Sequence, residues 1–364
     1  MPVWTREQDQ ALSAVARWLE TRGGPQVFRL FGYAGTGKST LAMHVAENVD
    51  GAVAFAAFTG KAALVMRSKG CEDARTIHSL IYRAAESEAE EPTFVLNDES
   101  DAARAKLIVI DECSMVDEEL GKDLLSFGRK VLVLGDPAQL PPVKGGGFFT
   151  EAEPDVMLTE VHRQAADNPI IRLSMAIREG GRLERGDFGD ARVISRDGLD
   201  PALVTGADQV LVGMNKTRRA YNGRLRQLRG YSGDFPSSGE KLVCLRNNRK
   251  KGLLNGALFT VKSAGALRRG KVRMLVIPED GDGRVLRVGV IEQFFNGGDA
   301  EIPYALRKES DEFDYGYALT VHKAQGSQWD NVTLFDESFA FREHRARWLY
   351  TGVTRAAKKL TVVM

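Results

Sequence analysis

The sequence predicts an α/β protein of more than one domain, and two observations carry this prediction. The chain has 364 residues. Compact domains usually hold about 100–200 residues, so we expect two domains or three. Continuous apolar runs recur between stretches of helical periodicity, at residues 27–31, 53–58, 107–110 and 131–134. Such runs are typical of strands buried on both faces of a parallel sheet, so residues 1–165 should form an open sheet covered by helices.

Local signals justify the other elements in order. Residues 5–20 should form a helix, because Thr5 and Gln8 match the capping-box pattern. A second set of apolar strands (209–212, 331–335 and 360–363) predicts a second α/β domain, made of residues 166–232 and 312–364. Residues 233–311 alternate turn signals with short β-rich runs, which predicts a small β domain inserted into the second one.

Composition narrows the class of protein. Lys and Arg number 50 and Asp and Glu 49, which excludes a uniformly basic nucleic-acid coat but not a local basic surface. Acids cluster in residues 84–103 and bases in residues 215–230. Three scattered cysteines give no disulfide framework. The charged start predicts no signal peptide, and no apolar run reaches the ~20 residues of a membrane span. We therefore expect a soluble protein of a reducing cytoplasm that does not bind membranes.

The segment 32–39 has the spacing of a phosphate-binding loop. Gly32, four residues, Gly37, Lys38 and Ser39 follow a predicted strand and precede a predicted helix. In that pattern the backbone N–H groups surround the β-phosphate, the lysine reaches the β- and γ-oxygens, and the hydroxyl binds Mg²⁺. The alternative is a chance glycine-rich turn, which would not need this strand–loop–helix context.

Polar residues follow the strands at 107–110 and 131–134. Asp111 and Glu112 come after the first of these strands, and Gln139 lies shortly after the second. Open α/β sheets bind ligands at the carboxyl ends of their strands. We expect Asp111 to hold Mg²⁺ with Ser39, Glu112 to activate the attacking water, and Gln139 to sense the γ-phosphate. A helix N-cap acid and an ordinary loop glutamine are the alternatives.

Eight blocks, taken in order, resemble the motifs of superfamily 1 DNA helicases, most closely those of the RecD/Dda branch. The resemblance runs from about residue 5 to residue 355. The blocks are GYAGTGKST (32–40), FTGKAA (58–63), TIHSL (76–80), IDECSMVD (110–117), LGDPAQLPPV (134–143), LTEVHRQ (158–164), YALTVHKAQGSQWDNV (317–332) and LYTGVTRA (349–356).

The resemblance implies two RecA-like P-loop motor domains with ATP and Mg²⁺ between them. It also implies a small β-barrel insertion in the second domain, at 233–311, and a short pin insertion in the first, at about 84–104. The implied catalytic residues are Lys38, Glu112, Gln139, Arg163 and Arg355. The implied nucleotide-binding residues are Gln8, Gly35, Thr36, Gly37, Lys38, Ser39, Thr40 and Gly326.

The resemblance also implies a track for single-stranded DNA. The implied contacts are Thr59, Lys61 and His78 in the first domain and Lys216, Thr320, His322 and Lys323 in the second. Phe94 would be the stacking tip of the pin, or else a residue packed under a loop. His78 has the alternative of a hydrogen-bonded core histidine. Arg219, Arg226 and Arg229 fall on one helix face, which either follows phosphates or is simply solvated.

These features together predict an ATP-dependent DNA helicase that moves 5′→3′ on single-stranded DNA and unwinds duplex at a fork junction, with polarity implied by the resemblance alone. Two alternatives remain open: an RNA or RNA–DNA translocase of the same superfamily, and an ATP-gated DNA-binding or loading accessory protein. A P-loop kinase leaves the second motor domain unexplained. A replication or recombination protein is a possible partner, and the compartment would be the cytoplasm, that of the host if the protein is phage-encoded.

Overall fold

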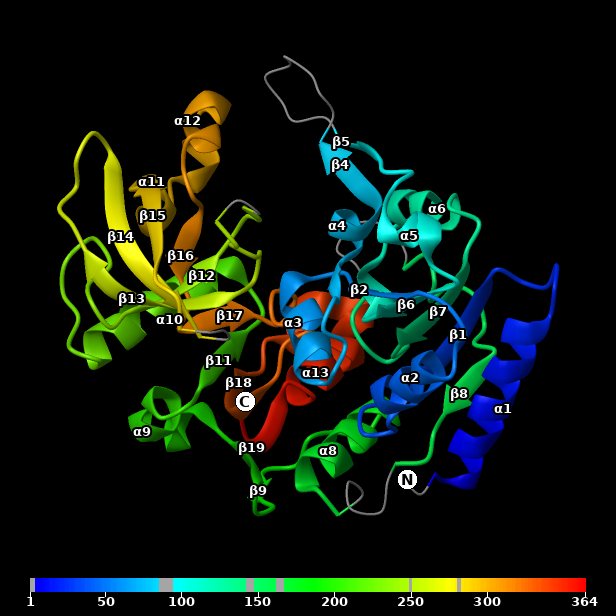
Figure 1. Ribbon diagram of the computed structural model, residues 1–364. Coiled ribbons are helices and arrows are strands. Elements are labelled where there is room, and N and C mark those ends of the chain that lie inside the picture. Colours follow the sequence, from blue (N-terminus) through cyan, green and yellow to red (C-terminus); the bar gives the residue numbers. More distant parts are fainter. Residues whose placement is uncertain (1–3, 85–93, 142–146, 162–166, 249–250, 280–282) are drawn as a thin grey trace. The chain divides into compact units, whose positions relative to one another are not determined.

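The computed structural model describes residues 4–84, 94–141, 147–161, 167–248, 251–279 and 283–364 (Figure 1). The chain divides into two compact units, Met1–Ile171 and Arg172–Met364. Each unit is built around its own parallel sheet. Among the described residues, no helix is long and apolar enough to cross a membrane.

The first unit contains a six-stranded parallel sheet in the order β3-β2-β6-β7-β1-β8. Its strands are β1 (Val27–Gly32), β2 (Val53–Ala57), β3 (Arg75–Thr76), β6 (Leu107–Asp111), β7 (Lys130–Gly135) and β8 (Val156–Leu158). Its helices are α1 (Arg6–Glu20), α2 (Lys38–Glu47), α3 (Gly60–Ser68), α4 (Ile77–Ile81), α5 (Asp101–Arg104), η1 (Cys113–Met115) and α6 (Glu118–Leu125).

Both faces of this sheet are buried, as the continuous apolar strands predict. In β6, Leu107 and Val109 join the apolar cluster that includes α1 and α2. Ile108 and Ile110 join the cluster on the opposite face, with α4 and α6. Side chains alternate across a strand, so a strand that is apolar at every position must be covered on both sides. In β6, polar groups are thereby confined to the end of the strand.

The segment around Phe94 forms a hairpin, but Phe94 is not its tip. Strand β4 (Tyr82–Ala84) pairs antiparallel with β5 (Phe94–Leu96), and Ala84 lies opposite Phe94. Phe94 is the first residue of the returning strand and 57% exposed, so it is not packed under a loop. The rest of the predicted pin, residues 85–93, lies outside the described part of the chain.

The second unit contains a six-stranded sheet in the order β17-β11-β18-β19-β10-β9, in which only β9 runs antiparallel to its neighbour. Its strands are β9 (Gly186–Asp187), β10 (Ala191–Ile194), β11 (Gln209–Val212), β17 (Ala318–Thr320), β18 (Trp329–Phe335) and β19 (Ala356–Val363). Its helices are η2 (Arg196–Gly198), α9 (Pro201–Thr205), α10 (Asn215–Leu228), η4 (Ser338–His344) and α13 (Arg345–Val353); α8 (Pro169–Arg178) begins in the first unit.

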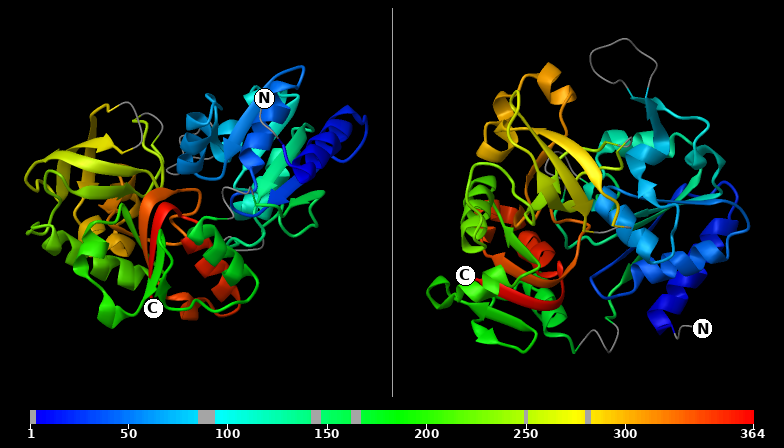
Figure 2. Two further views of the ribbon diagram at one scale, coloured as in Figure 1. Left: turned by 90° about the horizontal axis from the view of Figure 1, so that it is seen from below. Right: turned by 60° about the vertical axis from the view of Figure 1, so that its left-hand side comes forward.

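A second, antiparallel sheet follows α10, in the order β15-β14-β13-β12-β16 (Figure 2). Its elements are β12 (Lys241–Cys244), β13 (Leu258–Ala264), β14 (Lys271–Pro278), β15 (Leu286–Ile291), α11 (Gln293–Asn296), η3 (Asp299–Glu301), α12 (Tyr304–Lys308) and β16 (Phe313–Tyr315). In the described residues this sheet does not close into the predicted barrel. The edge strands β15 and β16 share no ladder; a single bridge joins Val290 to Asp311.

The antiparallel sheet shares one apolar core with the parallel sheet of the second unit. Only Gly316 and Tyr317 separate β16 from β17. Gln209 Nε2 donates to the carbonyl oxygens of both residues, at 3.1 and 3.0 Å. Asn222 Nδ2 donates to the carbonyl oxygens that flank them. This junction is therefore fixed by side chains of the parallel sheet and of α10.

The arginines of α10 do not form the phosphate-tracking face considered from the sequence. Arg226 is buried and forms two hydrogen bonds with Glu240, at 2.6 and 3.0 Å. Arg219 pairs with Asp299 at 2.6 Å, and Arg229 donates to the carbonyl oxygen of Thr205. Arg219 and Arg226 are thus paired with acids of the same unit, and Arg229 is bonded to a backbone carbonyl oxygen.

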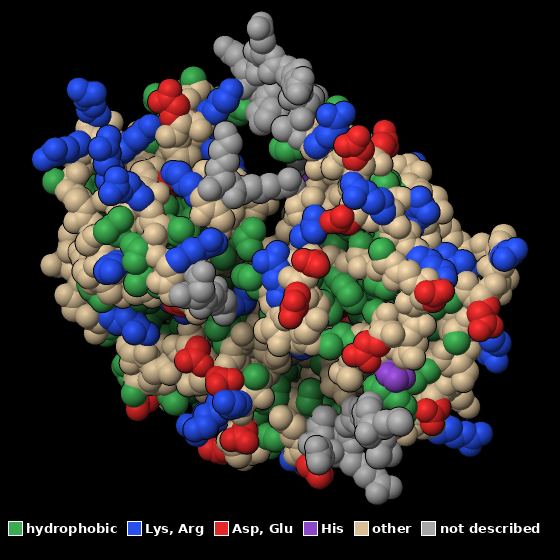
Figure 3. All heavy atoms as spheres, in the orientation of Figure 1, with side chains coloured by type: hydrophobic (Ala, Val, Ile, Leu, Met, Phe, Trp, Pro, Cys, Tyr) green, Lys and Arg blue, Asp and Glu red, His purple; other side chains and the backbone are tan. Residues whose placement is uncertain are grey.

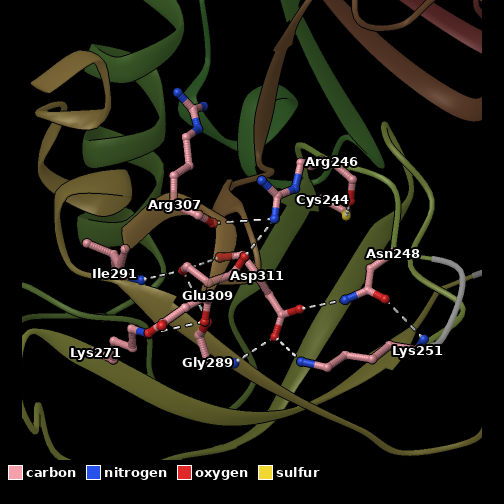
Figure 4. A network of polar contacts seen from close by, with 11 residues as sticks. Cys244, Arg246, Asn248, Lys251, Lys271, Gly289, Ile291, Arg307, Glu309 and Asp311 are labelled. Carbon is pink, nitrogen blue, oxygen red and sulfur yellow. Dashed lines mark hydrogen bonds and ion pairs between the residues drawn. The ribbon is translucent and has the colours of Figure 1, made fainter. Parts of the chain in front are cut away.

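A polar network stabilises the loop after β12 (Figure 4). Asp311 accepts hydrogen bonds from Asn248 Nδ2, Lys251 Nζ and the Gly289 amide, at 3.3, 2.5 and 2.9 Å. The Asp311 side chain is 3% exposed. A buried carboxylate needs such partners because its desolvation is costly, so this residue ties the loop to β15.

The buried Arg226–Glu240 pair gives a test of the fold. Glu240→Ala leaves the guanidinium buried without its carboxylate, so we expect the second unit to lose about 3–5 kcal/mol of unfolding free energy. The matched control is Asp299→Ala, which removes the acid partner of the more exposed Arg219 and should cost about 1 kcal/mol or less. Urea denaturation followed by tryptophan fluorescence measures both. Equal losses in the two variants would show that burial does not set the strength of this pair.

Candidate functional site: a phosphate loop and the carboxyl edges of two sheets

The glycine-rich loop lies between β1 and α2, as predicted. Gly35 and Gly37 have φ values of 81° and 83°, which favour glycine. A Cβ at Gly32 would lie 2.7 Å from Thr36 Oγ1, so this glycine permits close packing inside the loop. Lys38 begins α2, and its Nζ donates to the carbonyl oxygens of Gly32 and Tyr33 at 2.6 and 2.9 Å. The loop, the lysine and the helix N-terminus together form an anion-binding arrangement.

Ser39 and Thr40 occupy the first turn of α2, and Thr36 is buried within the loop. Helix α1 braces the loop through Gln8, which is 2% exposed. The Gln8 side chain completes the predicted capping box, because its Oε1 accepts from the Thr5 amide. Gln8 Nε2 donates to the Thr36 carbonyl oxygen at 3.0 Å.

The neighbouring Glu7 provides a brace that sequence reasoning missed. Its carboxylate accepts hydrogen bonds from the Thr159 and Glu160 amides, directly after β8. The Tyr33 amide donates to the Leu158 carbonyl oxygen. The loop is therefore stabilised by α1 on one side and by β8 on the other. A lone glutamate in the first turn of a helix gives no sequence signal for this contact.

The acidic pair lies at the carboxyl end of β6, beside the loop. Ser39 Oγ donates to Asp111 Oδ2 at 3.1 Å. The Glu112 amide donates to Asp111 Oδ1 at 2.8 Å. A hydroxyl and a carboxylate oxygen side by side fit Mg²⁺, which prefers oxygen ligands and usually completes its shell with water and phosphate. No group of three His, Cys, Asp or Glu side chains that could hold a metal occurs in the described residues, so these two oxygens would serve as part of a shared shell.

Glu112 has a strained backbone. Its φ and ψ are 54° and 46°, in the left-handed region that few residues other than glycine adopt. Strain of this kind clusters at functional sites. The residue that follows, Cys113, is fully buried. Burial raises the pKa of its thiol above the ordinary range, so Cys113 is no candidate nucleophile.

Gln139 lies one turn after β7, near the same edge. Its backbone amide donates to the carbonyl oxygen of Asp136, and its side chain is 8% exposed. Its Oε1 is buried and finds no donor among the described residues. A buried polar atom of this kind normally has a partner, which makes Gln139 a ligand-facing candidate.

The first-unit residues assigned to DNA lie at the carboxyl ends of β2 and β3. Thr59 caps α3 by accepting from the Ala62 amide at 3.1 Å. Lys61, in the first turn of α3, is 8% exposed. His78 lies in α4, with the Phe58 ring 6.2 Å from its own. His78 is exposed, so the alternative of a core histidine is wrong.

The second-unit residues assigned to DNA also gather at one carboxyl edge. Thr320 ends β17, followed by His322 and Lys323, and the exposed Lys216 lies just after β11. Burial, and then the nearby His344, lower the pKa of His322. Partial desolvation lowers the pKa of Lys323. More than a third of the residue's area is nevertheless exposed to solvent.

An aromatic stack behind His322 gave no clear sequence signal. The His322 ring lies 5.3 Å from that of Phe341, which stacks on Trp348 at 5.4 Å with an angle of 13°. Glu337 adds a second missed contact, because its carboxylate accepts from the Gly213 and Met214 amides at the start of α10. The Glu337 contacts join residues more than a hundred positions apart, and the aromatic stack crosses a kinked helix. Sequence periodicity reveals neither.

The structure describes one of the two arginines that the resemblance implies as catalytic residues. Arg163 lies outside the described residues. Arg355 is 5% exposed and donates to the carbonyl oxygens of Thr351 and Ser327 and to Thr354 Oγ1. Gly326, beside Ser327, has a φ of 72°. Arg355 and Gly326 are thus brought together at the turn that precedes β18.

These features define the chain as a P-loop protein with a nucleotide site at the edge of an α/β sheet. A family model described as an AAA domain matches residues 4–192, and one described as a UvrD-like helicase C-terminal domain matches residues 315–363. The chain belongs to this AAA-domain family and to the superfamily 1 helicases related to RecD, Pif1 and Dda.

Three of the curated relatives are named as ATP-dependent DNA helicases. The ATP-dependent RecD2 DNA helicase of Deinococcus radiodurans is 30% identical over 93% of this chain, which covers 47% of that protein. The ATP-dependent DNA helicase Dda of phage T4 is 32% identical over 41% of this chain and 37% of its own length. The ATP-dependent DNA helicase Pif1 of Bdellovibrio bacteriovorus is 24% identical over 85% of this chain and 78% of its own. The chain spans about half the length of RecD2, and its match to Dda covers 37% of that protein.

Solved structures support the fold. Bacteroides Pif1 bound to single-stranded DNA has a TM-score of 0.61 and 18% identity, covering 100% of this chain and 92% of the other. A Pif1 structure concerned with unwinding at forked double-stranded DNA has a TM-score of 0.62, with the same identity and coverage. The mixed α/β architecture with parallel sheets is therefore confirmed.

The strained backbone of Glu112 gives a test of the site. Glu112→Gly should raise the free energy of unfolding by about 0.5–1 kcal/mol relative to Glu112→Ala, because only glycine adopts the left-handed region without penalty. Both variants lose the same carboxylate, so the comparison isolates the backbone. Chemical denaturation without nucleotide measures the difference. A glycine variant no more stable than the alanine variant would show that residue 112 is unstrained.

Proposed function

We propose that this protein is an ATP-dependent DNA helicase that moves 5′→3′ on single-stranded DNA and unwinds duplex. The observation that carries the proposal is the pairing of a braced phosphate loop with Ser39, Asp111 and the strained Glu112 at one sheet edge. Membership of the RecD, Pif1 and Dda group supports the activity, and the group resemblance supports the polarity.

We assign the hydrolytic roles by geometry. Lys38 would exchange its two backbone carbonyl partners for phosphate oxygens, which are stronger acceptors because they are charged. Ser39 and Asp111 would hold Mg²⁺, which neutralises phosphate charge when it is bound. Glu112 would accept the proton of the attacking water. Gln139 would orient that water with its side-chain oxygen, which has no hydrogen-bond partner among the described residues.

The remaining nucleotide contacts rest on the family resemblance together with local geometry. Arg355 donates only to neutral acceptors in the described residues, so its charge is available to an anionic phosphate. We assign Arg355 and Arg163 to transition-state charge, where such arginines are worth about 10³–10⁵ in rate. For Gln8, both side-chain atoms already bond within the unit, which makes it a brace of the loop as well as the proposed reader of adenine.

We assign the single-stranded DNA track to two carboxyl edges, one in each unit. Thr59, Lys61 and His78 would contact the strand in the first unit. Thr320, His322, Lys323 and Lys216 would do so in the second. The shared position of each set at the end of parallel strands supports this assignment. The RecA-like domain limits (1–165, and 166–232 with 312–364), the insertion at 233–311, the pin at 84–104 and a replication or recombination partner belong to the same proposal.

A strand-displacement assay on tailed duplexes tests the activity and polarity. We expect ATP-dependent unwinding of a duplex with a 5′ tail and none with a 3′ tail. Lys38→Ala should abolish both ATP hydrolysis and unwinding while keeping single-strand affinity within about twofold, since the lysine touches phosphate and not DNA. Unwinding only from a 3′ tail, or hydrolysis stimulated by RNA and not by DNA, would contradict the proposal.

Phe94 tests the pin. An aromatic residue stacked on the last base pair contributes about 1–3 kcal/mol per base, comparable to one base-pair step of about 1–2 kcal/mol. Phe94→Ala should therefore keep DNA-stimulated hydrolysis within about twofold and cut unwinding of a 5′-tailed duplex severely. Val95→Ala is the matched control, because the adjacent residue of β5 faces the other side and is also exposed. Equal unwinding by both variants would exclude Phe94 as the pin.

A further inference from the structure

The β13–β14–β15 part of the inserted sheet exposes cations on its outer face. Burial alternates along β14, so Arg273 is exposed while Val272 and Met274 are buried. Arg287 of β15 lies opposite Leu275, two residues after Arg273, and therefore shares its face. Lys262 is exposed at the bulge of β13, and Arg268 and Arg269 are exposed at the turn into β14. We call the set Lys262, Arg268, Arg269, Arg273 and Arg287 the hairpin face.

In the part of the chain that the structure describes, no ion pair neutralises the charge of the hairpin face. Residues 262–278 contain five cations and no acid. In the described part of the chain, none of the five hairpin-face residues forms an ion pair; Lys271, beside them, pairs with Glu309 at 3.7 Å. Lys and Arg side chains gather over the β13–β14 hairpin in the space-filling view (Figure 3). Unpaired like charges repel one another, so such a surface gains free energy from a polyanion.

The turn between β13 and β14 adds an independent observation. Arg268 and Lys271 exchange both backbone hydrogen bonds, at 3.0 and 3.1 Å. The two residues between them, Arg269 and Gly270, have φ values of 52° and 71°. This is a type I′ turn, whose first central position favours asparagine or glycine. An arginine there is strained, and strained residues cluster at functional sites.

We propose that the hairpin face binds the phosphate backbone of double-stranded DNA. Four of its five residues are arginines, whose planar guanidinium matches phosphate in a bidentate manner. Residues 262–291 contain no Phe, Trp or Tyr, whereas single-strand sites combine cations with aromatic stacking platforms. The exposed, alternating cations of a sheet suit sequence-independent contacts to a duplex backbone. This goes beyond the motor activity, because the residues lie on the inserted sheet and not at the carboxyl edges assigned to the single strand.

Salt dependence of duplex binding tests the proposal. The variant Arg268→Ala/Arg269→Ala/Arg273→Ala is compared with wild type by fluorescence anisotropy on a short blunt-ended duplex. The slope of log K against log[salt] should flatten by about 0.9 for each phosphate that the variant no longer neutralises, and to the same extent for duplexes of different sequence. Oligo(dT)-stimulated ATP hydrolysis should stay within about twofold. The matched control, Arg172→Ala/Arg182→Ala/Arg185→Ala, removes three exposed arginines of the same unit and should leave the slope unchanged.

Two further measurements separate this proposal from others. Arg269→Asn introduces a residue that the type I′ turn favours. This variant should therefore fold at least as stably as wild type and still lose duplex affinity. Lys38→Ala should bind duplex like wild type, so failure of the motor proposal leaves this one standing. An unchanged salt slope in the triple variant overturns the inference. So does binding of poly-glutamate through these arginines without any binding of duplex, which would make the surface a site for acidic protein.

Discussion

The burial of both faces of the parallel sheets is the constraint on which the site depends. A strand such as β6, apolar at each of its first four positions, has no room for an uncompensated polar group. Its first polar residue, Asp111, therefore appears where the strand leaves the core. The same rule places Ser39 and Gln139 after neighbouring strands, and parallel strands end at a common edge. The residues proposed for hydrolysis gather at this edge because the buried part of the sheet excludes polar groups.

The sequence was most informative where a local rule determines the structure. Thr5 and Gln8 specify a helix start through the capping box, and it forms as predicted. The glycine spacing predicted a phosphate loop, and the structure places Gly35 and Gly37 of that loop in the left-handed region. The continuous apolar runs predicted buried strands whose order in the sheet they could not give, since strand order depends on which elements pack together rather than on any one strand's pattern.

Charged residues were the least predictable part. A helix face with Arg219, Arg226 and Arg229 has the same pattern whether it meets phosphate, water or protein acids. The structure decides through Glu240 and Asp299, which lie in segments that fold back on α10. The arginines of the hairpin face are the opposite case, because the structure leaves them exposed. Their role as a charged surface can be recognised only from the burial pattern of β14 and from the absence of ion pairs among the described residues. Phe94 was partly predictable. The sequence indicated the hairpin, but the position of Phe94 within it depends on the register of β4 and β5.

The short junction between β16 and β17 has a mechanical consequence. Two residues connect a strand of the inserted sheet to the strand that ends at Thr320, and Gln209 and Asn222 clamp that connection from the parallel sheet and from α10. A Cβ at Gly316 would lie 2.8 Å from the backbone of Leu242, so the joint has no slack to act as a hinge. The inserted sheet is thus connected to the parallel sheet of the second unit by a rigid junction rather than by a flexible linker. We therefore expect a displacement of Thr320 to rotate the inserted sheet as a rigid body, so that its far edge moves further than Thr320 itself.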